Sequence, residues 1–262
     1  MTAFPEVHRP EVPGRHRPVV LLHGGNVANW MWEPQLVAVR DRLALTPHLP
    51  GFGARVDEDW PGLPGAADDI AARIRMLGAE GPVDVVGLSL GGVLALHLAA
   101  RHPELVASVL TSGAAVTPVG GAARATSALQ LALWNQRWFW RGQALAFGLP
   151  KDSHELYVEH GVSVRRSTAK AMLDEVYAGG IPDGLADYRG RMLLVAGELE
   201  PAVMAESLDA LRDAVPHAQT RTAPGMHHVW NVEDVRHFNA MLRDWLRGGV
   251  HNWLLEPMQV LL

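Results

Sequence analysis

A serine set between glycines, Gly87-Leu88-Ser89-Leu90-Gly91, is the stretch of this chain whose residue types and spacing best fit chemistry. The apolar run VDVV precedes it, and a helix-forming segment follows. A sharp turn from a buried strand into a helix strains the serine backbone and exposes its oxygen. Glycines two residues to either side prevent a Cβ from colliding with neighbouring backbone. We therefore predict that Ser89 is a nucleophile, in preference to a bystander among packing glycines.

A serine hydroxyl needs a histidine base, and the histidine needs an acid that orients it. The loop PGMHHVWNVED offers His227 or His228, of which we favour His228. We expect the acid just after MLLVAG, where the sequence reads GELEPAV and the candidates are Glu200 and Glu198. The alternative for each glutamate is a solvated loop carboxylate or a charge near the N-terminus of the next helix.

The surrounding elements must bring these side chains together. Apolar runs predict strands at RPVVLL, VDVVGL, VASVLTSG, MLLVAG and QTRTAP, and a shorter strand in LALTPHLPGFGAR. Helical spacing predicts helices in WMWEPQLVAVRDRL, over about 66–78, from Leu90 to about His102, after MLLVAG, and from Val235 to Trp245. Alternating strands and helices predict an α/β fold with a mostly parallel sheet covered by helices on both faces.

Residues 114–185 lack any strand signal, so they cannot belong to the sheet. We predict that they form a helical cap over the carboxyl ends of the strands, where such sheets bind ligands. The predicted core then comprises residues 1–113 and 186–262.

The segments VVLLHGG, LPGFG, GLSLGG, AGELEP and PGMHHVWNVE occur in an order that resembles the α/β-hydrolase superfamily. The resemblance implies that Ser89 is the nucleophile, that His228 is the base and that Glu200 is the acid. Aspartate is usual at the acid position, so Glu198 is retained as a fallback.

The same resemblance implies an oxyanion hole formed by the backbone N–H groups of Gly25 and Leu90. It also implies structural roles for His23 and for His48, which stands where an aspartate is usual. The antiparallel strands at the N-terminus of such folds are shortened here, because few residues precede the first apolar run.

Apolar and aromatic residues near these segments predict a hydrophobic pocket, although packing in the core is the alternative for each tryptophan. The predicted pocket residues are Asn26, Trp30, Trp134, Trp138, Met226 and Trp230. A serine triad indicates acyl chemistry. The resemblance therefore implies an esterase or lactonase that cleaves a hydrophobic small molecule through an acyl-enzyme, without a cofactor or metal.

Three other functions use the same fold: a carbon–carbon bond hydrolase, a non-hydrolytic lyase or cyclase, and a receptor-like protein that binds a ligand. The glutamate at the acid position is the feature that favours the receptor-like protein.

The amino-acid composition argues against several other kinds of site and partner. The chain has no cysteine, which excludes disulfides, thiolate metal sites and cysteine nucleophiles. A net charge of −5 argues against nucleic acid or an anionic membrane as a partner. Because no long apolar run or signal peptide is present, we expect a soluble, cytoplasmic protein without a membrane span. The apolar tail NWLLEPMQVLL is expected to pack on the core or on a second copy, as in a homodimer.

Overall fold

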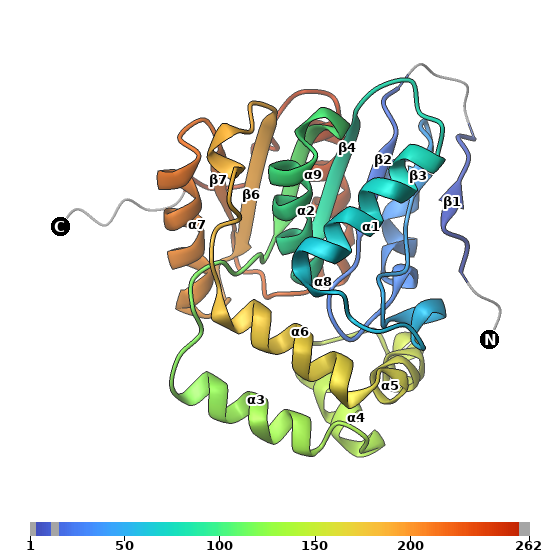
Figure 1. Cartoon of the computed structure of the whole chain (residues 1–262), viewed down its shortest axis with the longest axis vertical. Helices are drawn as coiled ribbons and strands as arrows, with labels where there is room; N and C mark the ends of the chain where they lie inside the picture. Colours follow the sequence, from blue (N-terminus) through green and yellow to red (C-terminus); the bar gives the residue numbers. More distant parts are fainter. Residues whose placement is uncertain (1–3, 12–15, 257–262) are drawn as a thin grey trace.

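The computed structural model describes residues 4–11 and 16–256, which form one sheet with helices around it (Figure 1). The sheet has seven strands in the order β1-β3-β2-β4-β5-β6-β7. They are β1 (Val7–His8), β2 (Val19–Leu22), β3 (Ala44–Leu45), β4 (Val83–Leu88), β5 (Val106–Ser112), β6 (Arg191–Gly197) and β7 (Gln219–Ala223). β1 is antiparallel to β3, and the other neighbouring strands are parallel. The predicted α/β fold with a mostly parallel sheet is confirmed.

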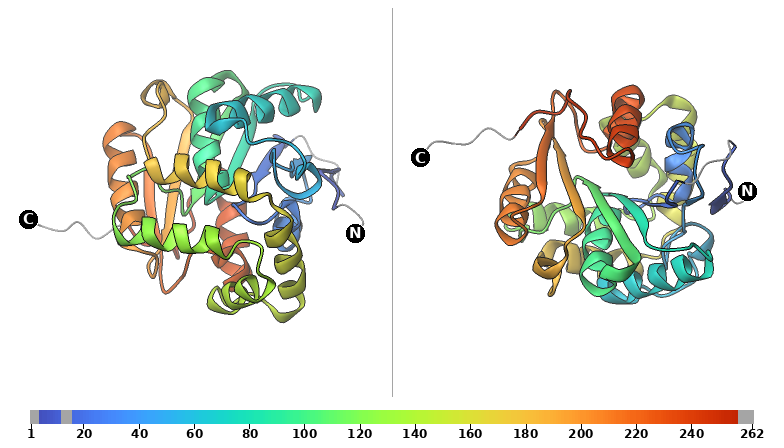
Figure 2. Two further views of the ribbon diagram at one scale, coloured as in Figure 1. Left: turned by 60° about the horizontal axis from the view of Figure 1, so that its bottom comes forward. Right: turned by 90° about the horizontal axis from the view of Figure 1, so that it is seen from above.

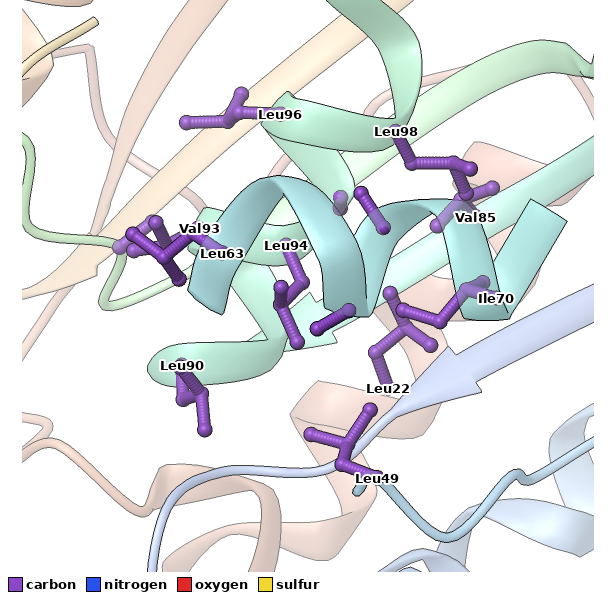
Figure 3. Close-up of a cluster of buried hydrophobic side chains, with 14 of the residues drawn as sticks. Leu22, Leu49, Leu63, Ile70, Val85, Leu90, Val93, Leu94, Leu96 and Leu98 are labelled. Atoms are coloured by element: carbon purple, nitrogen blue, oxygen red, sulfur yellow. The ribbon is translucent and has the colours of Figure 1, made fainter. Parts of the chain in front are cut away.

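Helices cover both faces of this sheet (Figure 2). One face packs against α1 (Gly62–Met76), α2 (Leu90–Arg101) and α7 (Ala202–Ala214), and the other against η1 (Asn29–Ala38) and α9 (Val235–Leu246). Successive strand residues point to opposite faces of the sheet. Val85 therefore packs in the core on the side of α1 and α2, and Val86 in the core on the side of η1 and α9. Figure 3 shows Val85 and Leu22 of the sheet beside Ile70 of α1 and Leu94 of α2. Burial on both faces explains why these strands are continuous apolar runs in the sequence.

Three local features refine the expected order of elements, and the first two differ from it. The segment predicted as a helix after the first strand is a 3-10 helix, η1, with Pro34 inside it. The run LALTP supplies only the two-residue strand β3. The N-terminal strand β1 is also two residues long, in keeping with the predicted shortening of this region. Short 3-10 turns complete the connections: η2 (Gly53–Arg55), η3 (Pro103–Leu105), η4 (Lys151–Ser153) and η5 (Leu185–Asp187).

The segment 114–185 contains helices and loops but no strand. Its helices are α3 (Ala122–Ala132), α4 (Arg137–Ala146), α5 (His154–Ser163) and α6 (Arg166–Ala178). They lie together at one end of the sheet, and α4 lies farther from the strands than α6 (Figure 1). The division of the chain into a core and a cap stays a prediction.

The connectivity of the sheet creates a crevice at this end. β2 lies between β3 and β4, so the chain leaves β2 toward one side and later returns to its other side. At such a switch point the loops after the two strands diverge and leave room for a ligand. Ser89 follows β4 directly, and Gly24 and Gly25 lie in the loop after β2.

The C-terminal residues continue past β7. The backbone of Leu255 forms two hydrogen bonds with Thr222, of 2.8 and 2.9 Å, and Leu254 is buried. Residues 257–262 lie outside the described residues, and so does their part of the expected packing on the core or on a second copy. In the described part of the chain, no helix is both long and apolar enough to cross a membrane.

Candidate active site

The turn between β4 and α2 holds Ser89 in an unusual backbone conformation. Its φ is +56° and its ψ is −119°, and the only other described non-glycine residue with a positive φ is Asn26. A Cβ on Gly87 would lie 2.1 Å from the Gly91 carbonyl oxygen, and one on Gly91 would lie 2.0 Å from the carbonyl oxygen of Leu22. The positive φ of Ser89 costs about 1–3 kcal/mol, and such a conformation persists where the surrounding structure imposes it. The turn therefore has the geometry of a nucleophile elbow.

A buried carboxylate contacts His228. Glu200 Oε2 lies 2.6 Å from His228 Nδ1, and Glu200 Oε1 accepts a hydrogen bond of 2.8 Å from the Gly197 backbone N–H. The Glu200 side chain is 1% exposed and that of His228 is 26% exposed. A carboxylate at Nδ1 favours the tautomer with the proton on that nitrogen, which leaves Nε2 as the acceptor. This is the arrangement that a general base requires.

The structure also places the alternatives. His227 is paired with Glu233, whose carboxylate lies 2.8 Å from its Nδ1, and its side chain is 61% exposed. Glu198 accepts a hydrogen bond of 2.7 Å from the backbone N–H of Gly225, away from either histidine ring. The geometry therefore favours the pair of Glu200 and His228 over the fallback residues.

The loop after β2 is held by His23 and Met31. His23 is fully buried, and its Nδ1–H donates to the Gly24 carbonyl (2.8 Å) while its Nε2 accepts from Leu49 N (3.1 Å). Burial lowers the pKa of His23 to about 3, so the imidazole stays neutral. The Met31 sulfur accepts a hydrogen bond of 3.3 Å from Gly24 N–H. These contacts orient the loop that carries Gly25, which lines the same cavity as Leu90.

Two glycines let the histidine loop approach the strand ends. A Cβ on Gly113, which has a φ of +64°, would lie 2.8 Å from Nδ1 of His228 and 3.2 Å from Glu200. A Cβ on Gly197 would lie 2.3 Å from the Met226 carbonyl oxygen. We did not predict a role for Gly113, although its position directly after the apolar strand VASVLTS is a signal that could have indicated one.

A buried polar network joins the histidine loop to η1. Asn231 Nδ2 donates to the Met31 carbonyl (3.3 Å), and Gln35 Nε2 donates to the Asn231 carbonyl (2.8 Å). Asn231 belongs to α8 (Trp230–Glu233), which begins directly after the loop of His228. Since the sulfur of Met31 contacts Gly24, one chain of contacts connects the two loops that flank Ser89.

A cavity of about 380 Å³ opens at these residues. Ser89 and His228 both line it, although no hydrogen bond between their side chains is found among the described residues. Such bonds often tighten only when substrate is bound. The cavity is also lined by residues of α5 and α6, including Tyr157 and Met172, which we did not predict as pocket residues.

Of the predicted pocket residues, Asn26 and Trp30 line this cavity, and four others require correction. Trp134 is buried and donates from Nε1 to the Val164 carbonyl (2.8 Å), whereas Trp138 is 61% exposed. Trp230 is also buried and donates to Ser112 Oγ (2.8 Å), and Met226 packs against the core beneath α9. Each side of a helix or loop has a different environment, and the residue type alone does not reveal which side a tryptophan occupies.

The other predicted structural histidine, His48, is packed inside the protein. His48 is 6% exposed, and burial lowers its pKa. A Cβ on Gly53 would lie 2.2 Å from its Nδ1, so the turn after β3 packs directly against this ring. Across the described residues, no group of three or more His, Cys, Asp or Glu side chains is placed to hold a metal ion.

Comparison with known proteins identifies the family of the chain. The alpha/beta hydrolase family, represented by its family model, matches residues 19–238. An AB hydrolase superfamily protein of Gibberella zeae is 28% identical over 238 residues, which are 87% of this chain and 79% of that protein. A pimeloyl-(acyl-carrier protein) methyl ester esterase of Chromobacterium violaceum is 31% identical over 192 residues, 70% of this chain and 69% of that protein.

Solved structures share the fold at lower sequence identity. The enol-lactonase from Burkholderia xenovorans is 19% identical, with a TM-score of 0.75 over 92% of this chain and 96% of that one. The family match, the sheet and the order of the motifs agree with the predicted resemblance. The chain belongs to the alpha/beta hydrolase family.

Proposed function

We propose that this protein is a serine hydrolase that cleaves a carboxylic ester or lactone of a hydrophobic small molecule. Ser89 Oγ attacks the carbonyl carbon while His228 Nε2 takes its proton, and Glu200 stabilises the imidazolium that forms. The N–H groups of Gly25 and Leu90 stabilise the negative oxygen of the tetrahedral intermediate. The C–O bond to the alcohol then breaks, and His228 gives the proton to the departing oxygen. Water attacks the acyl-enzyme in the same way and releases the acid.

The observation that carries this proposal is the Glu200–His228 contact of 2.6 Å, on the same cavity as a serine in a strained elbow. The glutamate was the feature that favoured a receptor-like binding protein. Its extra methylene permits a hydrogen bond to Nδ1, which supports a catalytic role for the glutamate. The similarity to an ester hydrolase of Chromobacterium violaceum also supports ester cleavage.

The proposal is tested by treating the protein with a fluorophosphonate and weighing it intact. Attack by an activated serine forms a Ser–phosphorus bond and expels fluoride. We expect one adduct on the wild type, none on Ser89→Ala, and strongly slowed labelling of His228→Ala.

The opposite outcomes are equally clear. A folded wild type that forms no adduct and hydrolyses no p-nitrophenyl ester would contradict the hydrolase and favour a binding protein. An adduct together with no turnover of any ester would favour a lyase, a cyclase or a carbon–carbon bond hydrolase.

A further inference from the structure

The cavity beside Ser89 is apolar and uncharged. Among its described lining side chains, none is Asp, Glu, Lys or Arg, and most are aliphatic or aromatic. A charged substrate group would lose its hydration there without gaining an ion-pair partner. The few polar groups on the cavity wall outside the loops of Ser89 and His228 therefore determine which polar groups of an uncharged substrate can bind there.

Gln143 of α4 and Tyr157 of α5 form such a polar contact on this wall. The Tyr157 hydroxyl donates a hydrogen bond of 2.8 Å to Gln143 Oε1. Tyr157 is 4% exposed, and its ring packs edge-on against the buried Trp140 at 5.8 Å. Burial raises the pKa of Tyr157, so its hydroxyl remains protonated. The tyrosine is thus a fixed donor that occupies the carbonyl end of the glutamine.

This contact fixes the direction of the Gln143 amide. With Oε1 bound to Tyr157, the two N–H groups of Nε2 point the other way, and Nε2 has no hydrogen-bond partner among the described residues. When a ligand oxygen replaces the water that such an amide would otherwise bind, the new hydrogen bond next to apolar surface makes the free energy of binding more favourable. Gln130 of α3 lines the cavity too, but no comparable contact among the described residues orients its amide.

We propose that Gln143 is a specificity-determining residue that donates a hydrogen bond from Nε2 to an uncharged carbonyl oxygen within the apolar part of the substrate. The inference rests on the proposed ester hydrolysis. Ser89 follows β4, whereas Figure 1 shows that α4 lies farther from the strands than α6 does, so we assign this oxygen to a part of the substrate other than the reacting carbonyl. The substrate class is accordingly a neutral ester or lactone with an apolar chain that is interrupted by one ketone or amide carbonyl.

The test uses two series of esters that differ only in the position of one ketone. In the first, p-nitrophenyl octanoate is compared with oxo-octanoates in which the ketone moves along the acyl chain. In the second, octyl acetate is compared with oxo-octyl acetates. We expect one member of one series to exceed its parent in kcat/KM by about tenfold, the value of one good hydrogen bond.

Two variants assign this preference to Gln143. Gln143→Leu removes the donor, and Gln143→Glu keeps an acceptor for Tyr157 but offers no N–H to the ketone. The ratio of kcat/KM for the oxo ester to that for its parent should fall to about one or below in both. Gln136→Leu, at an exposed position at the start of the same helix, should keep the wild-type ratio.

The proposal is overturned if no ketone ester is preferred in either series, or if the preference survives in both Gln143 variants. A wild type that hydrolyses neither the parent esters nor the oxo esters would instead contradict the proposed ester hydrolysis. In that case, calorimetric binding of octanone isomers to the wild type and to Gln143→Leu still tests the hydrogen bond. Equal affinity in the two proteins would overturn it.

Discussion

At the scale of single residues, the contacts of Glu200 support its proposed role as the acid, although its side chain is longer than the usual aspartate. Its carboxylate turns back over its own loop, where Oε1 accepts from Gly197 N–H (2.8 Å) and Oε2 faces His228. Both oxygens of a carboxylate that is 1% exposed are therefore bonded. The turn between β6 and α7 thus places a glutamate carboxylate within hydrogen-bond distance of the imidazole.

This geometry predicts the effects of two glutamine substitutions. Glu200→Gln replaces a charged acceptor with a neutral amide that no longer stabilises the imidazolium, so kcat for p-nitrophenyl butyrate should fall by about 10³–10⁴. Glu198→Gln, whose partner is the Gly225 backbone, should leave kcat near the wild-type value. If Glu198→Gln were the crippled variant and Glu200→Gln the active one, the acid would be assigned to the wrong residue.

At the scale of elements, the site depends on how closely the end of β5 approaches the histidine loop. Gly113 combines two requirements: a φ of +64°, and a side of the backbone that faces the imidazole of His228. Gly78, which follows α1, shares the first requirement with a φ of +68°, but a Cβ added there would meet no described atom within 4 Å. Comparing alanine substitutions at these two glycines therefore separates the effect of backbone strain from the effect of crowding next to His228.

Both alanine substitutions should destabilise the protein, but only one should inactivate it. Gly113→Ala and Gly78→Ala each carry a left-handed backbone penalty of about 1–2 kcal/mol, measurable as a lower free energy of unfolding in urea. Gly113→Ala must in addition displace His228, whose Nδ1 would lie 2.8 Å from the new Cβ. We expect its kcat/KM to fall by about a hundredfold, as small displacements in active sites commonly do. Full activity in Gly113→Ala would show that this close approach is not needed.

At the scale of the whole molecule, several imidazoles are kept neutral by burial. Burial lowers the pKa of His23 to about 3 and the pKa values of His97 and His160 to about 4, from the ordinary histidine value of 6.5. The unfolded chain therefore binds more protons than the folded protein between these values. The free energy of unfolding must fall as the pH drops from about 6.5 toward 4.

We expect urea denaturation to show this loss as the pH falls from about 6.5 toward 4, with a limiting slope of about 1.4 kcal/mol per pH unit for the fully buried His23 alone. Carboxylates with lowered pKa values, such as Asp68 at about 2, lose their contribution only at lower pH. His97→Gln removes one of the titrating groups, so its profile should be shallower than that of the wild type. A flat profile in the wild type over this range would contradict the neutral state of these histidines.

Much of the framework was predictable because it follows from local patterns. The runs VVLL, VDVVGL and MLLVAG are continuous and apolar since both faces of their strands are covered, and each forms a strand as predicted. The glycines around Ser89 are equally local, because a strand-to-helix turn constrains the residues beside it. The two-residue strand β1 gave no such pattern, and η1 has helical spacing without α-helical hydrogen bonding.

The order of the strands along the chain, the turn at Ser89 and the few candidate bases and acids all followed from the amino-acid sequence. Packing of distant elements selected which of these candidates meet: Glu200 contacts His228, whereas His227 contacts Glu233. It also decided that Trp30 lines the cavity while Trp134 and Trp230 are buried elsewhere, and that Tyr157 orients Gln143. Neighbours along the chain impose backbone geometry through short-range sterics. Contacts between distant elements depend instead on how whole faces pack, and no single residue encodes that.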